Sequence, residues 1–90
     1  MGRTDINFRY RQCAIHCLVH GCKNDGRKLI SWDELRERFG IAWESYAHEL
    51  MVKGMLHFSS GYVYLSREWV AMTRAEGMEA IRKMYPKRYV

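Results

Sequence analysis

The chain has 90 residues, of which 48% are hydrophobic and one is proline, and its formal net charge is +5. A chain of this length forms a single domain, residues 1–90, and this composition argues against disorder over most of it. No apolar run reaches the roughly 18 residues that span a bilayer, and the first ten residues lack the apolar core of a signal peptide. We therefore expect a cytoplasmic protein without a membrane segment, in which the moderate positive charge is compatible with a polyanionic partner.

The N-terminal third predicts one helix after a short polar end. We expect residues 1–6 to fray and residues 7–22 to be helical. In a helical projection one side, the predicted core side, carries Phe8, Arg11, Ile15, Leu18, Val19 and Cys22. The opposite side carries Arg9, Cys13, His16, Cys17 and His20. The predicted helix thus gathers histidines and cysteines away from its predicted core side.

That histidine and cysteine side allows two interpretations. Cys13 with Cys17, and His16 with His20, are each spaced i, i+4, which lets two side chains of one helix meet a metal ion. Structural zinc sites, however, take ligands from two separate elements, and no C-x-x-C or second Cys/His pair follows later in the chain. We favour packing of this side against a C-terminal helix or a second subunit, expect reduced thiols, and assign no metal or other cofactor.

The most informative stretch runs from residue 31 to residue 65. Before it, residues 21–26 (GCKNDG) predict a turn and residues 27–30 a short strand. Ser31 and Glu34 form a capping-box pattern that starts a helix, and Gly40 can adopt the positive φ that ends one. The sequence therefore predicts a short, well-delimited helix from residue 32 to residue 39.

A second helix and a hairpin follow at once. The apolar stripe Trp43, Tyr46, Ala47, Leu50 and Met51 predicts a helix over 43–53 with one buried face. Residues 55–58 and 62–65 are rich in aromatic and branched side chains and flank Ser59, Ser60 and Gly61, which predicts two strands joined by a tight turn.

Residues 66–85 leave two alternatives open. Either one helix begins at Ser66, or residues 69–72 form a further strand and Thr73 caps a shorter helix with Glu76 completing its capping box. In both cases a helix runs from about Thr73 until Pro86 stops it. Residues 87–90 form a basic tail that we expect to be flexible.

This order of elements resembles the winged helix-turn-helix family of DNA-binding domains. The resemblance implies a mainly α fold with a small β-hairpin and flanking N- and C-terminal helices. It also implies that the 43–53 helix enters the major groove beside a wing at 55–65, with homodimers reading two half-sites of double-stranded DNA. The residues that this places at DNA are Arg36, Glu44, Ser45, His48, Lys53 and Arg67.

The charges on the 43–53 helix support an alternative. The side chains that we expect to be exposed on this helix include two glutamates, Glu44 and Glu49, and a single lysine. Duplex DNA, in contrast, favours arginine and lysine. A winged-helix module that binds a protein would use Trp43, Glu44 and Glu49, with Trp43 and Tyr46 as either core or surface anchors. One form of this alternative is a phage or mobile-element protein that acts on a host protein or nucleoprotein complex. No catalytic constellation is present, so we expect no enzyme.

Overall fold

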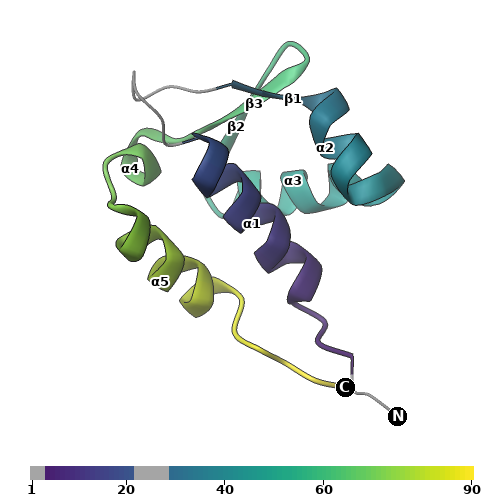
Figure 1. Ribbon diagram of the computed structural model, residues 1–90, viewed down its shortest axis with the longest axis vertical. Coiled ribbons are helices and arrows are strands. Elements are labelled where there is room, and N and C mark those ends of the chain that lie inside the picture. Colours follow the sequence, from purple (N-terminus) through teal and green to yellow (C-terminus); the bar gives the residue numbers. More distant parts are fainter. Residues whose placement is uncertain (1–3, 22–28) are drawn as a thin grey trace.

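The computed structural model describes residues 4–21 and 29–90. Its elements follow the chain as helix α1 (Phe8–Gly21), strand β1 (Leu29–Ser31), helix α2 (Trp32–Phe39), the short 3-10 helix η1 (Gly40–Ala42), helix α3 (Trp43–Val52), strands β2 (Leu56–Ser59) and β3 (Tyr62–Leu65), and helices α4 (Arg67–Val70) and α5 (Arg74–Met84). Helix α1 crosses the middle of the molecule with α5 along one side and α2 and α3 on the other (Figure 1). The predicted mainly α fold with a hairpin and flanking helices is confirmed.

The three strands form one antiparallel sheet in the order β1-β3-β2. Val63 in the central strand is paired with Ile30 on one side and Phe58 on the other. Val63 and Ile30 are buried, so one face of the sheet packs against the core. The predicted hairpin is confirmed, as is the part of the predicted strand that lies in the described residues. Residues 22–26 of the predicted turn lie outside the described residues.

Ser31 and Gly40 mark the start and the end of α2, as the sequence predicted. The Ser31 hydroxyl accepts a hydrogen bond from the Glu34 amide at 3.1 Å, and Gly40 ends α2 with a φ of +76°. The expected return bond from the Glu34 side chain to the Ser31 amide is not made within the described chain, because that carboxylate is hydrogen-bonded to His16. Half of the predicted capping box is therefore used to join α2 to α1.

The predicted division of α1 into a core side and an opposite side was partly wrong. Leu18 of the predicted core side is fully buried, but so are Cys13 and Cys17 of the opposite side, as the packing interpretation of that side requires, whereas Phe8 is 48% exposed. The cause is that α1 packs against α5 and α3 and also against strands β1 and β3, so more than one of its sides is covered. Small side chains such as cysteine and alanine let these neighbours approach closely.

Residues 66–85 form two helices separated by a short break. Helix α4 covers four residues, and Thr73 then caps α5 with both hydrogen bonds of a capping box, from the Glu76 amide to the Thr73 hydroxyl and from the Thr73 amide to the Glu76 carboxylate. The alternative of a further strand over 69–72 was wrong, since residues 67–70 are helical. The predicted start of a helix at Thr73 is confirmed.

The two ends of the described chain lie against each other. Asp5 and Tyr89 form an antiparallel bridge, the Ile6 amide donates to the Arg88 carbonyl at 2.9 Å, and the Val90 amide donates to the Thr4 carbonyl at 3.0 Å. Fraying was therefore the wrong expectation for residues 4–6 and 87–90, whose backbone groups pair between the two ends. Among the described residues, no helix has the length and apolar character needed to cross a bilayer.

Candidate functional site

The outward face of α3 carries three of the six side chains that the sequence placed at DNA. Glu44, Ser45 and His48 are exposed, and Lys53 is exposed just beyond the helix. Glu44, Ser45 and His48 make no hydrogen bond or ion pair within the described chain. As far as the described residues show, no intramolecular contact would have to break before these three side chains could contact a ligand.

The aromatic residues of α3 face the other way. Trp43 is 7% exposed, with its ring centroid 5.8 Å from that of Trp32. Tyr46 is half-buried and packs edge-to-face against the rings of Tyr10 and Phe39, whose centroids lie 5.5 and 6.4 Å from its own. The core interpretation of Trp43 is confirmed, and little of its surface is left for a partner.

Glu49 is engaged inside the fold. The Tyr85 hydroxyl, at the end of α5, donates to Glu49 Oε2 at 2.9 Å, and Lys53 Nζ lies 4.0 Å from the same oxygen. Burial first, and the neighbouring Glu49 carboxylate second, raise the pKa of Tyr85 well above its usual range, so this phenol stays a donor. Glu49 therefore adds less negative charge to the outer face than its position in the sequence suggested.

The predicted phosphate contacts are not brought together. Arg36 lies on the exposed side of α2 and pairs with Asp33 at 2.8 Å. Arg67 is exposed at the start of α4, and Figure 1 shows α2 and α4 on opposite sides of the molecule.

The hairpin presents a polar tip with aromatic flanks. Ser59 and Ser60 are exposed, Gly61 turns with a φ of +77°, and Tyr62 is 43% exposed. His57 is exposed, with its ring centroid 5.4 Å from that of Tyr64 on the paired strand. No lysine or arginine is present in this hairpin, so it offers hydrogen bonds and ring surface instead of charge.

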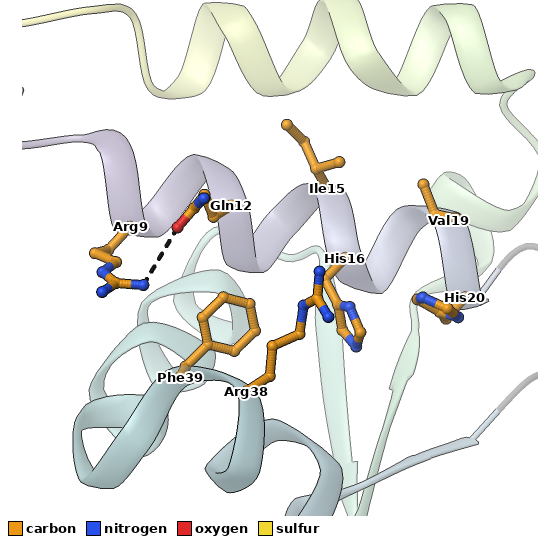
Figure 2. Close-up of a pocket in the computed structure, with 8 residues that line it drawn as sticks. All are labelled: Arg9, Gln12, Ile15, His16, Val19, His20, Arg38 and Phe39. Atoms are coloured by element: carbon orange, nitrogen blue, oxygen red, sulfur yellow. Dashed lines mark hydrogen bonds between the residues drawn. The ribbon is translucent and has the colours of Figure 1, made fainter.

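A second feature, which the sequence did not reveal as a site, is a groove between α1 and α2. His16 is 7% exposed, and its Nε2 atom is hydrogen-bonded to Glu34 Oε2 at 2.9 Å. The His20 ring lies 4.4 Å from the His16 ring, and Figure 2 shows the Arg38 guanidinium beside His16. The groove has a volume of about 570 Å³. The i, i+4 histidine spacing was the only sequence signal for it.

The electrostatics of His16 follow from this position. Burial lowers the pKa of His16, the hydrogen bond to Glu34 opposes that effect, and the positive charges of His20 and Arg38 lower the pKa further. His16 is therefore held in its neutral form more strongly than an exposed histidine.

The cysteines do not join the histidines. Cys13 and Cys17 are fully buried free thiols, and the pKa of Cys17 is raised by its hydrogen bond to Cys13 and by burial. Buried thiols of this kind are chemically inert and pack as small apolar groups. Within residues 4–21 and 29–90, no three histidine, cysteine or acidic side chains are arranged to hold a metal ion.

Taken together, the fold is a mainly helical domain whose helix-turn-helix order, three-stranded antiparallel sheet and hairpin are compatible with a helix-turn-helix and wing layout. Comparison with protein-family models, with curated proteins and with solved structures gives no match for this chain.

Proposed function

We propose that the protein is a small sequence-specific DNA-binding regulator that uses α3 and the β2–β3 hairpin. The observation that carries the proposal is the outward face of α3, where Glu44, Ser45 and His48 are exposed and unpaired within the described chain. Because α3 follows the tight Gly40 junction, it is presented as the second helix of a helix-turn-helix.

The chemistry of this face allows base reading. Ser45 and His48 can donate to or accept from base edges in the major groove, and Glu44 can accept from a cytosine amine. Lys53, with Arg36 or Arg67, would hold phosphates. The hydrogen bond from Tyr85 to Glu49 supports the proposal, since it engages that carboxylate inside the fold and leaves Glu44 as the free acid of the described α3 face. The setting is the cytoplasm, and a homodimer would read two half-sites.

Salt dependence tests the proposal directly. Binding to a library of duplexes should weaken steeply between about 50 and 200 mM salt, by about a thousandfold if roughly six phosphates are contacted. The mass of the complex measured in the same titration gives the oligomeric state. Absence of duplex binding at the lowest salt concentration would overturn the proposal.

A charge reversal locates the interface. Glu44→Lys on α3 should tighten non-specific duplex binding by about tenfold, because it replaces a repelled charge with one attracted to phosphate. Glu79→Lys is the matched control, since Glu79 is an exposed residue of α5 paired with Arg82 in the next turn. Equal effects of the two substitutions would place the DNA contact elsewhere.

One observation favours a second candidate, a protein-binding face. Ile41 in η1 is 93% exposed and Val52 at the end of α3 is 66% exposed, so two apolar side chains bracket the same outward face. Exposed apolar residues close to polar ones are a common feature of protein interfaces. Under this function Ile41→Ser and Glu44→Lys would each abolish capture of a protein partner, while duplex DNA would have no effect.

A further inference from the structure

The lining of the groove between α1 and α2 combines apolar and basic side chains. Ile15, Val19 and Phe39 supply the apolar part of its lining, and Arg9, Arg38 and His20 supply groups that carry or can take positive charge. Figure 2 shows His16 and His20 on the side of α1 that faces α2, and Ile15 and Val19 on its other edge. A volume of about 570 Å³ falls within the range of small-molecule sites.

Within the described residues, neither arginine of this groove forms an ion pair. Arg38 lies close enough to His16 to disfavour a second positive charge there. The Oε2 atom of Glu34 is already hydrogen-bonded to His16. Arg9 is bonded to the neutral Gln12 at 3.3 Å. An anion placed between Arg38 and His20 would therefore meet attraction that the fold leaves unused.

Acidic residues mark where that anion would not bind. A neighbouring hollow shares His16, His20 and Arg38 but is also lined by Asp33, Glu34 and Glu37. An anion in that hollow would face three carboxylates. The groove beside Phe39 and Ile15 has no carboxylate in its lining, so it is the place where negative charge and an apolar body fit together.

We infer that this groove binds a small carboxylate with an aromatic or branched apolar body. Its carboxylate is held by the planar guanidinium of Arg38, whose donors match carboxylate geometry, with His20 as second donor. Its apolar body lies against Phe39, Ile15 and Val19. The lining of the site contains no residue of α3, so the inference goes beyond the proposed function and does not depend on it.

Benzoate is the probe that tests the inference, with three comparison compounds. Titration calorimetry should show saturable binding of benzoate, with benzamide, acetate and inorganic phosphate each at least about tenfold weaker, which corresponds to about 1.4 kcal/mol. Benzamide keeps the ring without the charge, whereas acetate and phosphate keep a charge without the ring. Any of the three binding as tightly as benzoate overturns the inference.

Two arginines on α2 supply matched variants. Arg38→Gln should weaken benzoate binding at least about tenfold, since a charged hydrogen bond is lost. Arg36→Gln, which removes an exposed arginine paired with Asp33, should leave binding unchanged. On the unmodified protein, benzoate should shift the NMR signals of the His20 and Phe39 rings more than that of the His57 ring. Unchanged binding by Arg38→Gln, or shifts centred on His57, overturns the inference.

Discussion

His16 shows how one residue links two helices. It was predicted to lie away from the core, yet it is buried, with the Phe39 ring 5.8 Å from its own ring and the Glu34 carboxylate 2.9 Å from its Nε2 atom. The sequence could not show this contact, because Glu34 lies 18 residues further along and had a complete local role as a capping residue. Burial makes protonation of His16 unfavourable, and this has a consequence for stability.

We expect stability to fall on mild acidification. Since the pKa of His16 is lowered in the folded state, mainly by burial, the unfolded chain binds the proton first below about pH 6.5. The free energy of unfolding should therefore decrease from pH 7.5 to pH 5.5, as measured by urea denaturation. His16→Gln should reduce that decrease, whereas the exposed His57→Gln should not. A His16→Gln protein with the full decrease would contradict the argument.

The packing of α5 on α1 gives an element-scale prediction. A methyl group at Gly77 would lie 2.7 and 2.8 Å from the two terminal carbons of the fully buried Leu18. Gly77→Ala should gain about 1 kcal/mol of helix propensity and lose about 1–3 kcal/mol to overpacking, so the net effect is destabilising by about 1 kcal/mol.

The second half of this test removes the obstruction. In a Leu18→Val background the terminal carbons are gone, and Gly77→Ala should stabilise by up to about 1 kcal/mol. Ala75→Gly on the exposed side of α5 gives the propensity effect alone. Denaturation of the single and double variants measures the coupling, and a Gly77→Ala effect with the same sign in both backgrounds would show that Leu18 is not the cause.

Elements whose ends depend on a few adjacent residues were predictable from the sequence. Ser31 before α2, Gly40 after it and the Thr73–Glu76 pair at α5 each act through hydrogen bonds or φ values within one turn. The buried side of α1 was not predictable, because helical periodicity assumes one covered face and α1 is covered by elements from three later parts of the chain.

The candidate site likewise has features that the sequence could predict and features that it could not. The exposure of Glu44, Ser45 and His48 followed from the apolar stripe of α3, which places them on the opposite side. The engagement of Glu49 did not, since its partner Tyr85 is 36 residues away. A charge that appears free on a helical projection can be paired by a distant element, and that pairing changes which ligands the surface favours.

At the scale of the whole molecule, Asp5 holds the two ends of the described chain together. Its carboxylate pairs with Arg11, which also donates to the Tyr85 carbonyl at 3.0 Å, and accepts from the Arg88 amide at 3.1 Å. This explains why Arg11 occupies the predicted core side of α1. Asn7 adds a bond from its side-chain amide to the Pro86 carbonyl at 2.7 Å. The junction fixes the N-terminal end of α1 to the C-terminal end of α5.

Acid should release this junction. The hydrogen bond from Arg11, more than any other cause, lowers the pKa of Asp5 to about 2 from 3.8. The stabilisation is thus complete above about pH 4 and is lost as the pH falls towards 2. Asp5→Asn should lower stability at pH 7, flatten the acid part of the stability profile and speed hydrogen exchange at the Ile6 and Val90 amides. Asp33→Asn, which removes an exposed carboxylate paired with Arg36 on α2, should do none of these. If exchange at Ile6 and Val90 is as slow in Asp5→Asn as in the unmodified protein, the backbone pairing alone holds the ends and the carboxylate is not required.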